Sequence, residues 1–120
     1  MASLSGTRRV VRTNPVTGFK ALYVNKSFTK RIVELSPDES DALLAYLFRH
    51  IAENFNFQVR FRWSPDDLAI WDNRSTNHSG IFDFGKQRRN GDRCCSLGEK
   101  PFLDPNSQSR EAALRASGDY

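Results

Sequence analysis

Three side chains in the second half of the chain could bind a metal or an anion: His78, Arg89 and Arg93. His78 is one of only two histidines in 120 residues, and a neutral imidazole is a common metal ligand. Arg89 and Arg93 have a spacing that places both guanidinium groups on one face of a strand, and Gly91 between them leaves room for a ligand. Guanidinium groups recognise carboxylates and oxyanions through paired hydrogen bonds. The alternative is that both arginines are solvated charges in the run KQRRNGDR.

A mainly β framework is expected to position these side chains. The run FQVRFRW alternates apolar and polar residues, which is typical of a strand with one buried face. The run SPDD at 64–67 predicts a tight turn, so the segments on either side of it should be antiparallel neighbours. The expected strands are residues 21–25, 57–63, 68–72 and 91–98, and residues 31–35 form a second apolar segment. His78 follows the strand at 68–72 and a polar loop.

One helix is expected at about residues 37–53. Ser36 can cap the first turn, Pro37 suits the first helical position, and Glu39 completes a capping box. Apolar side chains follow at helical spacing, namely Leu43, Leu44, Leu47, Phe48 and Ile51. His50, near the C-terminal end of this helix, is expected to be structural or solvent-exposed.

The ends of the chain show weaker patterns. Residues 1–9 are expected to be flexible, and residues 104–120 to form a disordered or weakly helical tail. The strands between them expose more apolar surface than one helix can cover, yet they are too few to close a sandwich or a barrel. The sequence therefore indicates that part of a fold is missing.

The charge and cysteine content exclude several classes of protein. The net charge is +4 and the pI about 9.4, but the basic residues are spread from Arg8 to Arg115, so nucleic acid is not an expected partner. Cys94 and Cys95 are adjacent, which favours buried or half-buried free thiols in a reducing compartment. The sequence has no apolar run long enough to span a membrane and no signal-peptide core. We expect a soluble, cytoplasmic protein without a membrane partner.

Several stretches of the sequence resemble one enzyme family. These are VVRTNPVTGFKALYVNKSFTKRIVELSPDESDALLAYLF, then FQVRFRWSPDDLAIWDNRSTNH, then RRNGDR and SLGEKPF. Together they are similar to the C-terminal half of the taurine dioxygenase-like (taurine/2,4-dichlorophenoxyacetate dioxygenase) family, and most similar to its fungal sulfonate dioxygenase branch. The resemblance covers about residues 8–103, and we take residues 10–103 as the C-terminal part of such a domain.

The resemblance implies a double-stranded β-helix (jelly roll) with Fe(II) and 2-oxoglutarate as cofactor and cosubstrate. His78 resembles the distal iron ligand, Arg89 the arginine that binds the 2-oxoglutarate carboxylate, and Arg93 the arginine that faces the substrate sulfonate. A small sulfonate such as taurine and O2 would then be the partners. The family reaction hydroxylates the substrate beside the sulfonate and gives sulfite, an aldehyde, succinate and CO2.

The sequence also departs from the family pattern. The family's other two iron ligands form an upstream His-x-Asp pair, whereas this chain has no His-x-Asp and its other histidine, His50, is followed by Ile51 and Ala52. Asp72, six residues before His78, could be imagined as a carboxylate ligand, but the family pattern places it at a strand end and loop, where it has a turn or hydrogen-bonding role. The resemblance thus implies a fragment that is inactive alone. Two alternatives remain: a non-catalytic anion-binding or interaction module that keeps the arginine pair, and a basic nucleic-acid binder, which ranks last. Exposed strand edges also leave homo-oligomers open.

Overall fold

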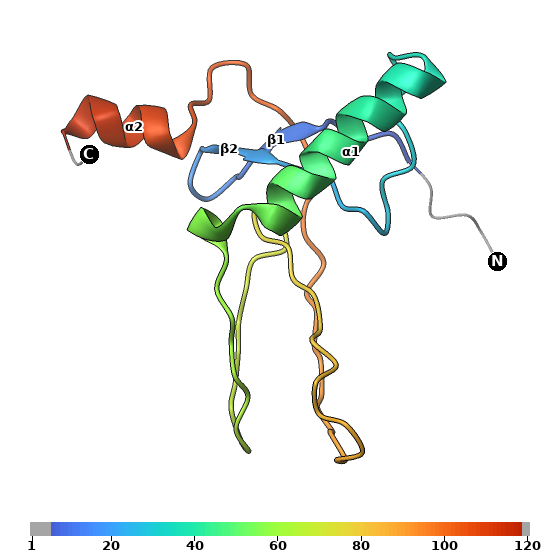
Figure 1. The fold of residues 1–120 in the computed structure, drawn as a ribbon. Coiled ribbons are helices and arrows are strands. Elements are labelled where there is room, and N and C mark those ends of the chain that lie inside the picture. Colours follow the sequence, from blue (N-terminus) through green and yellow to red (C-terminus); the bar gives the residue numbers. More distant parts are fainter. Residues whose placement is uncertain (1–5, 119–120) are drawn as a thin grey trace.

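A computed structural model describes residues 6–118 of the chain (Figure 1). The elements are β1 (Val11–Thr13), β2 (Lys20–Leu22), α1 (Pro37–Glu53), the 3-10 turn η1 (Phe55–Phe57) and α2 (Arg110–Ser117). In the view of Figure 1, helix α1 crosses in front of the small β1–β2 sheet, and long extended segments leave from one side. The flexible N-terminus expected at 1–9 falls largely on residues 1–5, outside the described residues.

The sheet is an antiparallel pair in which Val11 faces Leu22. The NPVTG turn closes it: the Asn14 side chain accepts a hydrogen bond from the Val16 N–H at 2.9 Å, and Gly18 has a φ of 71°, a value that favours glycine. The strand predicted at 21–25 therefore exists, but it begins and ends earlier.

The C-terminal segment returns to this sheet. The Thr13 N–H donates to the Phe102 carbonyl at 2.8 Å, and the Lys20 N–H donates to the Gln108 carbonyl at 2.8 Å. Helix α2 follows, and the Ser109 side chain caps it. Of the segment at 104–120, which was expected to be disordered or weakly helical, residues 110–117 form this helix, because Ser109 supplies an N-cap and Gly118 a left-handed C-terminal end.

Helix α1 has the predicted bounds, Pro37–Glu53. The Glu39 carboxylate accepts hydrogen bonds from the Ser36 N–H at 3.0 Å and the Ser36 hydroxyl at 2.6 Å, which lowers the pKa of Glu39. Ser40 and Leu44 form its buried face. The Ser40 hydroxyl also accepts a hydrogen bond from the Ile32 N–H at 2.8 Å, which fixes the preceding segment to the helix.

The prediction of buried strands at 57–63, 68–72 and 91–98 is wrong for this chain. These segments are extended but have no strand ladder, and they form the limbs of two hairpins (Figure 1). The expected buried face is exposed: Phe57, Val59, Phe61 and Trp63 have relative exposures of 56%, 94%, 52% and 46%. The physical reason is that a two-stranded ribbon is stable only against a covering layer, and the described residues supply none.

The apolar segment at residues 31–35 forms turns and irregular backbone. The expected burial of the two cysteines is wrong. Cys94 and Cys95 are free, as expected, but both are exposed because their limb packs against no other layer. Among the described residues, no helix has the length and apolar character that a membrane span needs.

Candidate functional site

The loop that leads to His78 is organised by Asp72. Its carboxylate accepts hydrogen bonds from the Arg74 N–H at 2.9 Å, from Arg74 Nε at 2.8 and 3.1 Å, and from Asn14 Nδ2 at 3.2 Å. Its carbonyl accepts from the N–H groups of Ser75 and Thr76. Donation by Arg74 lowers the pKa of Asp72 from 3.8 to about 2. Asp72 therefore has the turn-stabilising role expected from the sequence.

A chain of ion pairs extends from this loop into the body. Arg74 Nη1 donates to Glu99 Oε2 at 3.3 Å, and Glu99 Oε1 accepts from Arg12 Nη2. Arg12 is only 2% exposed, and its guanidinium carbon lies 5.0 Å from the centre of the Tyr23 ring. The pKa of Glu99 is lowered by its own backbone N–H and then by the two arginines. Three segments far apart in the sequence thus meet at one carboxylate.

His78 lies just after this loop. Its ring and the Trp71 ring have centres 4.7 Å apart and are tilted by 55°, and the Trp71 Nε1–H donates to Asn73 Oδ1 at 2.9 Å. His78 is exposed. The loop therefore presents the imidazole on the surface, with one face against an indole ring.

The second hairpin connects His78 to the two arginines. Its turn is closed by the Gln87 N–H, which donates to the Phe84 carbonyl at 3.1 Å. Counted outward from this turn, His78 and Arg93 occupy matching positions on the two limbs, and Arg89 lies nearer the tip. The Arg89 guanidinium lies 5.7 Å from the centre of the Phe84 ring.

The two arginines are exposed, and the structure does not enclose them. Arg89, Asn90, Gly91 and Asp92 line an open hollow of about 590 Å³ near the tip of the hairpin. The hollow is polar and open to solvent, so it does not by itself bury an anion. The sequence-based expectation of an inward-facing arginine pair would require a layer that covers this hairpin.

The described residues do not fit a complete iron site. No group of three or more His, Cys, Asp or Glu side chains within residues 6–118 is arranged to hold a metal ion. Fe(II) in a site of this kind needs several ligands with defined geometry, and His78 is a single imidazole. Asp72 is not a second ligand, because its oxygens are occupied by Arg74 and Asn14.

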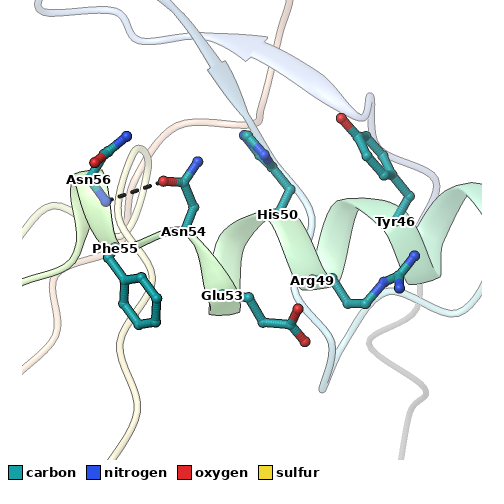
Figure 2. A pocket seen from close by; sticks show the side chains of 7 residues that line it. All are labelled: Tyr46, Arg49, His50, Glu53, Asn54, Phe55 and Asn56. Carbon is teal, nitrogen blue, oxygen red and sulfur yellow. Dashed lines mark hydrogen bonds between the residues drawn. The ribbon is translucent and has the colours of Figure 1, made fainter.

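A separate hollow of about 470 Å³ lies at the C-terminal end of α1 (Figure 2). The Tyr46 and His50 side chains point to one side of the helix, and Arg49 and Glu53 point to the other. The centre of the His50 ring lies 6.2 Å from that of the stacked Tyr46 ring and 5.4 Å from that of the Phe57 ring. His50 is exposed and part of a ring stack, so it has the structural or solvent-exposed role that the sequence predicts.

Sequence reasoning did not find Arg12 and Glu99, which the structure joins across 87 residues. Arg12 interrupts the apolar run VVRTN, and a charge in the middle of a strand is a signal that a counter-charge must be found elsewhere. That signal identifies the need for a partner but not which of the chain's acidic residues supplies it.

Residues 4–95 match the model of the family described as taurine catabolism dioxygenase TauD, TfdA family. The chain belongs to this family. The matched range includes His78, Arg89 and Arg93.

Relatives with assigned activities agree with the family match. An alpha-ketoglutarate-dependent dioxygenase of Neocamarosporium betae is 48% identical over 113 residues, which is 92% of this chain and 33% of the relative. The alpha-ketoglutarate-dependent sulfonate dioxygenase of Saccharomyces cerevisiae is 38% identical over 96 residues, 79% of this chain and 23% of the relative. An alpha-ketoglutarate-dependent sulfate ester dioxygenase of Pseudomonas putida is 42% identical over 92 residues, 77% of this chain and 30% of the relative. The chain spans about a third of the length of such curated relatives.

Proposed function

We propose that this chain supplies the C-terminal part of an Fe(II)- and 2-oxoglutarate-dependent dioxygenase domain of the jelly-roll type. The observation that carries the proposal is the order His78, Arg89, Arg93 on one hairpin, within a range that matches the family. The exposed apolar limbs support it, because they have the alternation of sheet strands but lack the layer that would cover them. Residues 10–103 would form the domain part.

In this proposal each side chain has one task. His78 contributes one imidazole ligand, and the remaining iron ligands come from residues that correspond to the other two thirds of the relatives. Arg89 pairs with the distal carboxylate of 2-oxoglutarate. Arg93 pairs with the anionic group of the substrate, for which a guanidinium is suited because it stays charged and donates several hydrogen bonds.

The substrate class that we propose is a small sulfonate, with taurine as the first candidate. Relatives named as sulfonate and sulfate ester dioxygenases support this choice. A sulfonate carries no proton near neutral pH, so binding it requires a fixed cation rather than a hydrogen-bond acceptor. One oxygen atom of O2 would enter the substrate beside the sulfonate and the other would enter succinate. The hydroxylated product then releases sulfite and leaves an aldehyde.

A chimera tests the proposal directly. The stretch of the Saccharomyces cerevisiae sulfonate dioxygenase that matches this chain is replaced by the corresponding residues of this chain, and succinate release is measured with Fe(II), 2-oxoglutarate and taurine. We expect turnover that depends on the sulfonate and is abolished by His78→Ala. Arg89→Ala should raise the KM for 2-oxoglutarate at least tenfold, as expected for a lost charge-assisted pair.

The neighbouring arginine provides the matched control. Arg88→Ala removes the same charge one position away, where the side chain of a strand points to the opposite face, and it should leave the KM within about twofold. A folded chimera that binds Fe(II) but gives equal effects for Arg88→Ala and Arg89→Ala would refute the assignment of Arg89. The unmodified 120-residue chain should release no succinate above background, and robust turnover would contradict the need for further ligands.

A further inference from the structure

Ion pairs connect the loop before His78 to the end of the second hairpin. The link runs from Asp72 to Arg74 and from Arg74 to Glu99. Glu99 directly follows the limb that carries Arg93, and Asp72 begins the loop that ends at His78. The same carboxylate is fixed to the body by Arg12 of β1.

Separate atoms of Glu99 and Arg74 make the individual contacts of this link. Glu99 accepts from Arg12 with Oε1 and from Arg74 with Oε2, so its carboxylate sets the separation of the two arginines. Arg74 Nε in turn is within 3.1 Å of both carboxylate oxygens of Asp72. Because a guanidinium is planar and its donors are rigidly spaced, such contacts define orientation more strictly than apolar packing does.

The burial of Arg12 shows that this link is not an ordinary surface ion pair. Arg12 is 2% exposed, and its Nε is buried without a hydrogen-bond partner. Burying a guanidinium with one unmet donor costs stability. Arg12 lowers stability in this respect, yet it binds the Glu99 carboxylate at which three segments meet. Such a side chain is suited to fixing the relative positions of these segments.

We propose that Arg12, Glu99 and Arg74 are positioning residues, which hold the Asp72 loop in the turn that places the His78 ring against Trp71 and beside the limb of Arg93. The consequence for His78 as a metal ligand rests on the function proposed above. The placement of the His78 ring is independent of that function, since it involves only side chains that the structure describes. These residues touch neither iron nor substrate and act through the loop.

Proton NMR of the 120-residue chain tests the placement without iron. The chain has two histidines, so His50→Gln leaves the ring protons of His78 as the only imidazole signals. At one fixed pH used for all variants, the indole ring of Trp71 should displace these signals from the position measured in a Trp71→Leu reference. We expect Arg74→Gln and Glu99→Gln to lose more than half of that displacement.

Helix content and a remote ion pair serve as controls. The far-UV circular dichroism of α1 should be unchanged in Arg74→Gln, whose altered side chain is already 30% exposed, so this variant decides the matter if Glu99→Gln unfolds. Arg115→Gln removes an exposed ion pair on α2 and should leave the His78 signals in place. The proposal is overturned if the displacement survives in folded Arg74→Gln, or if the unmodified chain shows none. Failure of the chimera to turn over would remove the proposed function and leave this result standing.

Discussion

The asymmetric burial of the Arg12–Glu99 pair makes a quantitative prediction about stability. Arg12 is 2% exposed, whereas the Glu99 side chain is 32% exposed. Glu99→Gln keeps the shape of the side chain but leaves a buried guanidinium without its carboxylate. Breaking a buried pair in this way costs about 3 kcal/mol, the lower end of the range, because water can reach the pair from the Glu99 side. For a chain of this length the loss corresponds to roughly 12 °C in Tm.

The reverse substitution should cost much less. Arg12→Met keeps the aliphatic stem and removes the buried charge with its unmet Nε donor, and the partly exposed Glu99 can be hydrated in its place. We expect a loss of about 1 kcal/mol, close to 4 °C in Tm, because apolar replacement of a buried ion is often nearly neutral. The double variant should have nearly the same Tm as Arg12→Met, since it has no buried guanidinium that lacks a carboxylate partner.

Thermal unfolding followed by circular dichroism at 222 nm (the amide signal of helices) measures all three variants. Asp83→Asn is the matched control, because the Arg60–Asp83 pair is 68% and 60% exposed and exposed pairs contribute about 0–1 kcal/mol. The reasoning is refuted if Arg12→Met is as destabilising as Glu99→Gln, or if the two changes add in the double variant.

Three other predictions follow from the same contacts. Asp72 has a pKa of about 2 instead of 3.8, so its contribution to stability is complete above about pH 4 and is lost as the pH falls to about 2. Acid unfolding of Asp72→Asn should lack this pH dependence, and an acid-unfolding profile equal to that of the unmodified chain would contradict the prediction. The Thr13 hydroxyl accepts a hydrogen bond from the Asp104 N–H at 2.9 Å. Thr13→Val should therefore lower the free energy of unfolding in urea by about 1–2 kcal/mol and expose the segment after Phe102 to proteolysis. Thr17→Val, at an exposed hydroxyl, should have neither effect. Ser36→Ala removes the cap of α1 and should cost about 1 kcal/mol, with less helical signal at 25 °C; full retention of that signal would show that the cap is dispensable.

Local signals in the sequence predicted local structure well. Helix α1 was predicted with its full bounds because Ser36, Pro37 and Glu39 define its start within a few residues. Asp72 was assigned to a turn from the family pattern, and its hydrogen bonds do reach mainly the next four residues. Such features depend on neighbours in the chain and need no knowledge of the rest of the fold.

Features that depend on a second surface were not predictable in the same way. The alternation from Phe57 to Trp63 correctly describes an amphipathic ribbon, but whether its apolar face is buried depends on a layer that the pattern cannot supply. The partner of Arg12 lies 87 residues away, and no periodicity connects them. His78, Arg89 and Arg93 were proposed from the spacing that the family shares, and their roles stay predictions until the chimera is assayed.

The return of the C-terminal segment to β1 has a consequence for synthesis on the ribosome. The Arg12 charge meets its carboxylate only when residue 99 has emerged, and the Thr13 hydroxyl meets its donor only with residue 104. Strand β1 is therefore synthesised well before the residues that bury it. During translation, α1 can form from its own local signals while β1 is still unburied, so the nascent chain should acquire the α1 helix well before β1 becomes resistant to protease.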